Sequence, residues 1–294
     1  MIHTQWRSEH LKRTIIPYIF ILPFLSSYIL FFIYPAFYSL ILSFYRYRGY
    51  GKATFIGLAN YINLINYGTM WRTLGNTFFY FIGSFIPVTL AAFTTAMLVR
   101  SKPVRNFQNI YKPIIFLPQV CAVVASSLCF KIIFGERVGV FSQILGRPIP
   151  FLSETSLMRW SVVALITWRA IGWYFIIYLS GLTTISEDIL EAATIDGTNS
   201  LQTTWYITIP LMKPIFMLAF ITNAIGSLKI YIEPNLLLAS NYDPPMQAAP
   251  YINIILNSMQ GGQFGMACAA GWVLVLVIFL LTLVQLRIFK DNNQ

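Results

Sequence analysis

The sequence has 294 residues, of which 57% are hydrophobic and only 10% are charged, and its mean hydropathy is +0.65. A soluble domain carries about 25% charged residues, whereas about 20 consecutive apolar residues span a bilayer. The composition therefore excludes an ordinary soluble domain and predicts an all-α integral membrane protein. The net charge of +10 does not indicate nucleic-acid binding, because basic residues flank the apolar runs, as head-group anchors do.

Six long apolar runs predict six transmembrane helices. In chain order they cover residues 14–45, 73–99, 113–134, 160–183, 209–232 and 266–286. The first run is too long for the core of a signal peptide, and prolines at positions 23 and 35 predict a bend within it. Residues 1–13 form a polar N-terminal segment, residues 14–290 form the membrane domain and residues 291–294 form a short tail. The longer polar loops cover residues 46–72, 135–159 and 233–265.

Residues that bind metals or carry out catalysis are scarce. Cys121, Cys129 and Cys268 lie in or beside apolar runs without the spacing of metal ligands, and the histidines His3 and His10 lie in the polar N-terminal segment. No G-x-x-x-x-G-K-[ST] loop occurs, so the chain has no nucleotide-binding P-loop of its own. We therefore expect no enzymatic activity and no cofactor or metal bound by this chain.

Residues 184–208, between the fourth and fifth runs, hold the only cluster of carboxylates in this apolar sequence. The cluster consists of Glu187, Asp188, Glu191 and Asp196. Acidic residues suit the positive N-terminal end of a helix, and either Ser186 or Thr184 can cap that end, with Thr184 and Glu187 spaced as in a capping box. Gly197 can take the left-handed conformation that ends a helix. The sequence therefore predicts a helix–turn–helix segment, which we call the elbow, between two spans.

The elbow resembles the EAA loop of ABC importer permeases, which has Glu-Ala-Ala, a Gly six residues after the Glu and an Ile-x-Leu-Pro ending. The matching residues are Glu191, Ala192, Ala193, Gly197, Ile207 and Pro210, with Ile209 in place of the usual Leu. Asp196 also fits the fuller form of the motif, EAA-x-x-DG. The similarity extends over most of the chain and points to the carbohydrate-importer branch, which includes the maltose permease pair. An ordinary amphipathic cytosolic loop is the alternative interpretation.

The resemblance implies that the chain is one permease subunit of a bacterial ABC importer for sugars or oligosaccharides. It implies a second homologous permease, two ABC ATPase subunits that bind ATP and Mg²⁺, and an extracellular or periplasmic solute-binding protein that docks on the outer loops. Lys and Arg are nearly balanced between the two sides and do not orient the chain. The orientation comes from the resemblance, which places the elbow and both termini in the cytosol of a multi-pass cell-membrane protein.

The resemblance also assigns roles within the elbow. Glu191 would pair with a basic residue of the ATPase, Ala192 and Ala193 would allow close approach, and Gly197 would supply the turn. Glu191 as a solvated helix charge is the alternative.

Two polar stripes flank the elbow and predict a substrate path, because polar groups inside spans usually face the bundle interior. Arg169 and Trp173 lie at i and i+4 in the fourth span, and Asn223, Ser227 and Tyr231 are spaced likewise in the fifth. Aromatic rings stack on sugars, and amides, hydroxyls and guanidinium groups bond to sugar hydroxyls. If Arg169 faces the substrate, it favours an acidic sugar such as a uronate oligosaccharide.

Each of these residues also has a structural interpretation. Arg169 can pair with a partner subunit, the two aromatic residues can be packing or interfacial side chains, and Asn223 and Ser227 can bond between helices.

A secondary transporter driven by an ion gradient is the alternative function. It requires a membrane-buried carboxylate, and Glu233 lies only at the edge of a predicted span. An intramembrane enzyme is not supported, because no G-x-S-x-G motif and no pair of intramembrane aspartates occurs.

Overall fold

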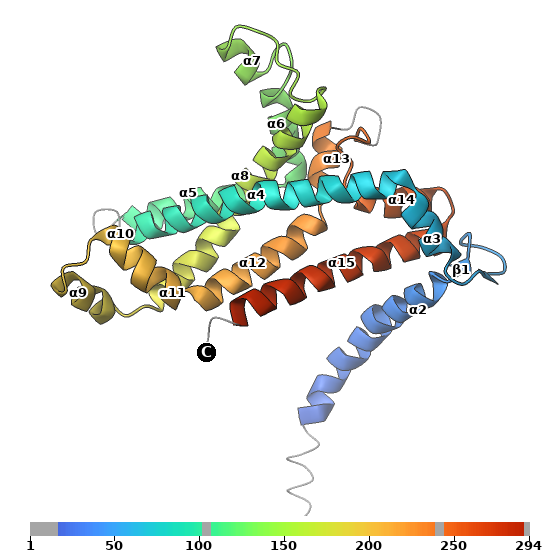
Figure 1. The fold of residues 1–294 in the computed structure, drawn as a ribbon, viewed down its shortest axis with the longest axis horizontal. Helices are drawn as coiled ribbons and strands as arrows, with labels where there is room; N and C mark the ends of the chain where they lie inside the picture. Colours follow the sequence, from blue (N-terminus) through green and yellow to red (C-terminus); the bar gives the residue numbers. More distant parts are fainter. Residues whose placement is uncertain (1–16, 102–106, 239–243, 291–294) are drawn as a thin grey trace, which may run out of the picture. The chain divides into compact units, whose positions relative to one another are not determined.

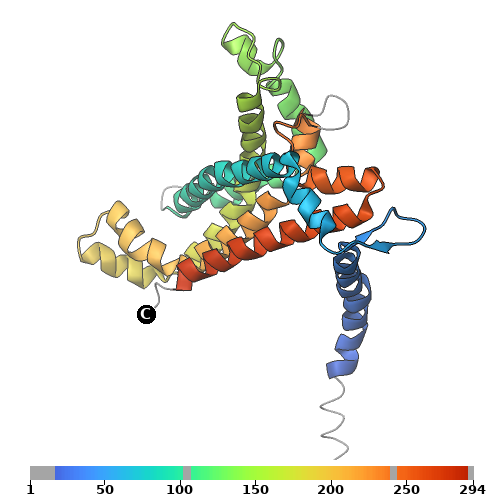
Figure 2. The same cartoon turned by 45° about the vertical axis from the view of Figure 1, so that its right-hand side comes forward.

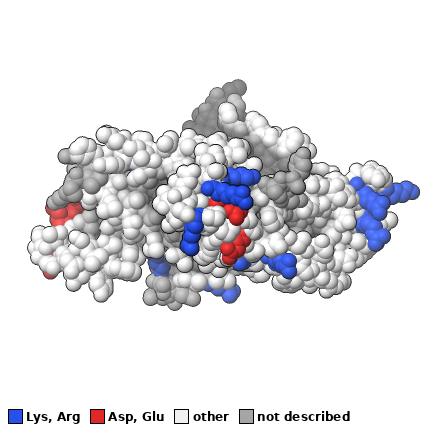
Figure 3. Space-filling model, turned by 90° about the horizontal axis from the view of Figure 1, so that it is seen from above, with Lys and Arg blue, Asp and Glu red and all other residues white. Residues whose placement is uncertain are grey.

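The computed structural model describes residues 17–101, 107–238 and 244–290, which are helical apart from two short strands (Figure 1). These residues form two compact units. The first unit contains residues 17–66 and 255–272, and the second contains the other described residues. Figure 3 shows a largely uncharged surface on which Lys, Arg, Asp and Glu gather in a few separate places. The expected all-α membrane class is confirmed.

The first unit starts with a helix over Pro17–Leu42 whose side chains are almost all exposed. Its middle turn is a π-helix, η1 (Ile29–Ile33), and α2 (Tyr34–Leu42) follows directly. The helix runs through both Pro23 and Pro35 without a break. The antiparallel strands β1 (Tyr45–Arg46) and β2 (Thr54–Phe55) follow, and then α3 (Ala59–Asn66) (Figure 2).

Side-chain bonds tie these segments of the first unit together. The amide of Asn60 donates to the carbonyl oxygens of Ser43 at 2.8 Å and Tyr45 at 3.0 Å. The Trp272 indole, on α15 (Phe264–Lys290), donates to the Ser39 hydroxyl at 3.2 Å. These bonds hold the start of α15 against the end of α2.

The core of the second unit lies between α4 (Gly68–Arg100), α8 (Thr155–Thr183) and α12 (Lys213–Leu228). α4 and α8 begin five residues before the predicted second and fourth spans, and α15 covers the sixth. Long apolar helices of this kind satisfy their own backbone groups, which is the condition for crossing a bilayer. With the helix over Pro17–Leu42, they make four candidate spans among the described residues.

The third and fifth predicted spans are not straight helices. α5 (Gln108–Val120) and α6 (Val123–Ile133) meet at 90°, and the helical segment Ser200–Leu211 meets α12 at 70°. Pro113 and Pro118 weaken the first of these pairs, since a proline removes a helix hydrogen bond. The described residues hold up to six spans only if each bent pair counts as one.

Short helices occur within or at the edges of the segments that sequence analysis assigned to polar loops. They are α7 (Val140–Ile144), α13 (Ile232–Leu238) and α14 (Ile252–Gln260), together with α3. The α4 side chains hold the segment before α14: Asn76 donates to the Ala249 carbonyl at 3.0 Å, and the Thr77 hydroxyl accepts the Tyr251 N–H at 2.8 Å. Polar residues of a long apolar helix thus fix a segment that has few internal bonds.

Gly172 provides a test of the packing between α8 and α5. A Cβ at this position would lie 2.8 Å from the carbonyl oxygen of Ile115 and 3.0 Å from the Cα of Phe116. Gly172→Ala is therefore expected to destabilise the protein by about 1–3 kcal/mol, because backbone must move. Thermal unfolding of the purified chain in detergent measures the loss.

Gly226→Ala is the matched control, because a Cβ at this helical position meets no atom within 4 Å. It is expected to leave stability unchanged or to raise it, as Ala does in a helix. Equal melting temperatures for the two variants would contradict the close helix packing.

Candidate functional site

The elbow begins where α8 ends. Thr184 is the C-cap of α8, and its hydroxyl donates to the Gly181 carbonyl at 2.8 Å. Ser186 caps α9 (Glu187–Ile195) by accepting the Ile189 N–H at 3.4 Å. The predicted capping box of Thr184 and Glu187 is therefore wrong, because Thr184 caps the end of α8 and Ser186 is the residue that caps α9.

The turn after α9 forms as the sequence predicts. Asp196 is the C-cap of α9, and Gly197 has a φ of +80°, the left-handed region that favours glycine. Thr198 then bonds back to the Ala193 carbonyl through both its N–H, at 3.1 Å, and its hydroxyl, at 2.7 Å. These bonds satisfy a carbonyl at the end of the helix and fix the direction in which the chain leaves it.

The second arm of the elbow starts with a capping box that sequence analysis missed. Asn199 accepts the Gln202 N–H at 2.8 Å, and the Gln202 side chain accepts the Asn199 N–H at 2.9 Å. α10 (Ser200–Thr203), the π-helix η3 (Thr204–Thr208) and α11 (Ile209–Leu211) follow. The Asn-x-x-Gln spacing is the signal that could have located this start.

The elbow exposes charge and apolar surface together. Glu191, Ala192 and Asp196 are exposed, whereas Ala193 is buried and does not share the face of Ala192. The side chain of Glu191 makes no hydrogen bond or ion pair with any other residue that the structure describes. Large apolar side chains are also exposed on the elbow, namely Ile195, Leu201, Trp205 and Tyr206. Such a surface is typical of a protein-binding site.

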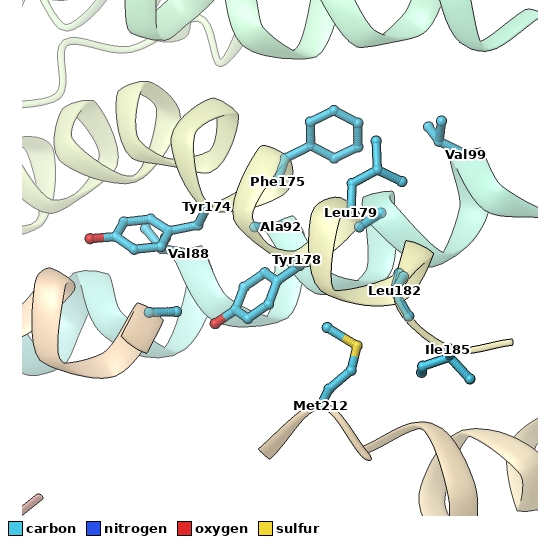
Figure 4. Close-up of a cluster of buried hydrophobic side chains, with 12 residues drawn as sticks. Val88, Ala92, Val99, Tyr174, Phe175, Tyr178, Leu179, Leu182, Ile185 and Met212 are labelled. Atoms are coloured by element: carbon cyan, nitrogen blue, oxygen red, sulfur yellow. The ribbon is translucent and has the colours of Figure 1, made fainter. Parts of the chain in front are cut away.

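Both ends of the elbow enter one buried cluster (Figure 4). Ile185, just before α9, is 6% exposed, and Met212, just after α11, is 1% exposed. They belong to the same cluster as side chains of α4, α8 and α12, which include Val99, Leu182 and Ala219. Pro210 lies in α11 at the second of these ends and is exposed. Figures 1 and 2 show α9 and α10 projecting beyond the ends of α8 and α12.

The predicted substrate-path residues of α8 have different surroundings. Arg169 makes an ion pair of 2.6 Å with Glu233 of α13, and the two side chains are 17% and 19% exposed. Trp173, one turn further along α8, is 47% exposed. The intramembrane arginine therefore has a carboxylate of the same chain as its partner, which sequence analysis did not identify.

The second stripe is partly buried in the helix bundle. Asn223 and Ser227 are buried, and the Ser227 hydroxyl donates to the Asn223 amide oxygen at 3.2 Å. Tyr231 does not continue the i+4 stripe, because α12 ends at Leu228. Periodicity alone did not show this, but Gly226 and Pro234 lie on either side of the break and are local signals that could have indicated it.

No group of three or more His, Cys, Asp or Glu side chains that could hold a metal ion occurs among the residues described.

Comparison with known proteins decides the family. Residues 89–291 match the model of the binding-protein-dependent transport system inner membrane component. The chain belongs to this family. It is therefore a membrane-spanning component of a transport system, and its relatives include proteins described as transport system permeases.

Two relatives cover almost the whole chain. The arabinooligosaccharides transport system permease protein AraP of Bacillus subtilis is 29% identical over 96% of this chain and 91% of its own length. The lactose transport system permease protein LacF of Rhizobium radiobacter is 32% identical over 94% of each chain.

A solved structure shows the same fold. A chain of a bacterial alginate ABC transporter, in complex with an alginate pentasaccharide-bound periplasmic protein, superposes with a TM-score of 0.82 at 20% identity. The match covers 97% of this chain and 98% of that chain.

The Arg169–Glu233 pair can be tested by replacing its members with apolar residues. Removal of one partner leaves a largely buried charge, so Arg169→Met and Glu233→Leu should each destabilise the protein, by less than the roughly 3–5 kcal/mol typical of a fully buried pair. The double variant should be more stable than either single variant, and thermal unfolding in detergent measures all three.

Lys229→Met is the control, because Lys229 is exposed at the end of α12 and should contribute little. Additive losses in the double variant would show that the two charges do not stabilise each other.

Proposed function

We propose that this chain is a permease subunit of an ATP-driven importer of sugars or oligosaccharides, and that the elbow couples it to the ATPase. The observation that carries this proposal is the geometry of the elbow. Its acidic and apolar surface is exposed on α9 and α10, while its two ends are buried at Ile185 and Met212. A segment with an exposed surface and buried ends can bind another protein and can transmit that protein's motion to the membrane helices.

The mechanism follows from how rigidly the elbow is attached. ATP-driven closure of two ATPase subunits would bring two elbows together, one from this chain and one from a second homologous permease. Because each elbow end packs against α4, α8 and α12, its displacement moves those helices as a body and opens the pore to the other side. Glu191, exposed and without a partner of its own among the described residues, is the residue proposed to pair with a basic side chain of the ATPase.

The elbow also sets the proposed orientation. A segment that docks on an ATPase lies in the cytosol, and six spans then place both termini in the cytosol of a cell-membrane protein. The outer loops, with α7 and α13, are then on the side from which a solute-binding protein delivers the sugar. The alginate transporter structure, which includes a periplasmic protein, supports this arrangement.

The names of the relatives support a carbohydrate substrate, since AraP and LacF are described as permeases for arabinooligosaccharides and lactose. Trp173, exposed on α8, offers an aromatic face for a sugar ring, and Arg169, Asn223, Ser227 and Tyr231 remain proposed path residues. The pairing of Arg169 with Glu233 balances its charge, which favours a neutral sugar over an acidic one.

The proposal is tested by substitutions in the elbow. Glu191→Lys reverses the proposed contact charge, and Gly197→Asp puts a side chain and a second charge at a left-handed turn. Both variants should insert in the membrane normally but lose at least tenfold in sugar uptake, with ATP hydrolysis no longer responding to the loaded binding protein. Uptake and hydrolysis are measured in proteoliposomes that hold the complete complex.

Asp291→Lys is the control, because it makes the same change of charge outside the elbow. Full transport by both elbow variants would refute the coupling role. Uptake driven by an ion gradient without ATP would instead identify a secondary transporter.

A further inference from the structure

A cation from α4 lies at the junction between α8 and the elbow. The guanidinium of Arg100, the last residue of α4, donates to the carbonyl oxygens of Leu182 and Ile185, the latter at 3.0 Å. These acceptors belong to the last turn of α8 and to the linker before α9, more than 80 residues along the chain from Arg100. The Glu187 carboxylate, in the first turn of α9, also interacts with this charge.

The chemistry of the junction suits an arginine. The last carbonyl groups of a helix have no partner within it, and they carry the negative end of the helix dipole. A guanidinium has several N–H donors in a fixed plane, so one side chain can bond two carbonyl oxygens that point in different directions. Arg100 thus fixes both the end of α8 and the direction of the linker that leads into α9.

The two hydrogen bonds of Arg100 constrain the backbone at the point where the elbow begins. Ile185 is the residue at which the elbow leaves the buried cluster, and Arg100 holds its backbone while Val99 packs in the same cluster. Apolar packing resists separation of the helices but is not directional. The two hydrogen bonds add a directional constraint from α4 to the backbone bonds already present at this end of the elbow.

We propose that Arg100 is a positioning residue that sets the orientation of the elbow relative to α4, so that a force on α9 is passed to the membrane helices. This inference rests on the proposed coupling function. Without Arg100 the elbow remains folded, since its own caps at Ser186 and Asn199 are intact, but the angle at which it leaves α8 is no longer fixed.

The first experiment measures the orientation without the ATPase. Nitroxide labels are placed at Leu98→Cys on α4 and Asp188→Cys on α9, both exposed, after Cys121, Cys129 and Cys268 are replaced by Ser. Double electron–electron resonance then gives the distance distribution between the labels. Arg100→Gln should broaden this distribution at least twofold, and Arg100→Lys, which can still donate to one carbonyl, should broaden it less.

The second experiment measures coupling in proteoliposomes of the complete complex. Arg100→Gln should lower the number of sugar molecules imported per ATP hydrolysed by about fivefold or more, with Arg100→Lys intermediate. Arg287→Gln, which removes an exposed arginine near the end of α15, is the matched control and should change neither measurement. A variant that merely unfolded would lose ATP hydrolysis and uptake together and would not change their ratio.

The outcomes separate this inference from the coupling proposal. If Glu191→Lys uncouples the complex but Arg100→Gln leaves the label distances unchanged, the positioning role is refuted while the coupling role stands. If Arg100→Gln broadens the distances but the ratio of uptake to hydrolysis is normal, the role of Arg100 in transmission is refuted. If Glu191→Lys is fully active, the coupling proposal fails, whatever Arg100 does.

Discussion

The structure depends on one constraint: both ends of the elbow are anchored in the same buried cluster of the second unit. Ile185 and Met212 are separated by 27 positions in the sequence, yet both pack with α4, α8 and α12. Gly181 is part of this arrangement, because a Cβ there would lie 2.7 Å from the Ile215 side chain and 3.0 Å from that of Met212. Close-packed interiors resist such additions, so the two ends of the elbow cannot shift independently without repacking of the core.

Two pairs of polar side chains in the second unit are formed within the chain, which limits what their members can offer to a substrate. Arg169 is paired with Glu233, and Ser227 with Asn223. A charge in an apolar environment is costly unless it is paired, so the Arg169–Glu233 pair needs both members. The region around α8 and α13 therefore presents little net charge, while Trp173 remains available as an aromatic surface.

The sequence was sufficient for features that depend on local chemistry. Apolar length predicted α4, α8 and α15, and the glycine at position 197 predicted a left-handed turn that the structure confirms. Sequence analysis did not predict the features that depend on contacts with distant parts of the chain. Pro113 and Pro118 indicate a weak helix, but the 90° bend lies after them, at Cys121, whose backbone is extended.

Long-range pairing was also beyond sequence reasoning. Glu233 was visible as a carboxylate at the edge of a span, and Arg100 as one of several basic residues after the second span. The local sequence around either residue does not indicate its partner, because the contacts join residues that are 64 and more than 80 positions apart. The break of α12 before Tyr231 separates Tyr231 from Asn223 and Ser227, and Gly226 and Pro234 on either side of it were weak local signals.

α4 shows how such long-range contacts give one helix two attachments. Near its N-terminal end Asn76 and Thr77 hold the backbone of residues 249 and 251, and at its C-terminal end Arg100 holds that of Leu182 and Ile185. At about 1.5 Å per residue, the 33 residues of α4 extend for about 50 Å, more than the hydrocarbon thickness of a bilayer. A displacement of either attached segment must therefore move the other or bend α4 between them. Pro87, inside α4, is the place where a helix hydrogen bond is missing, so bending concentrates there.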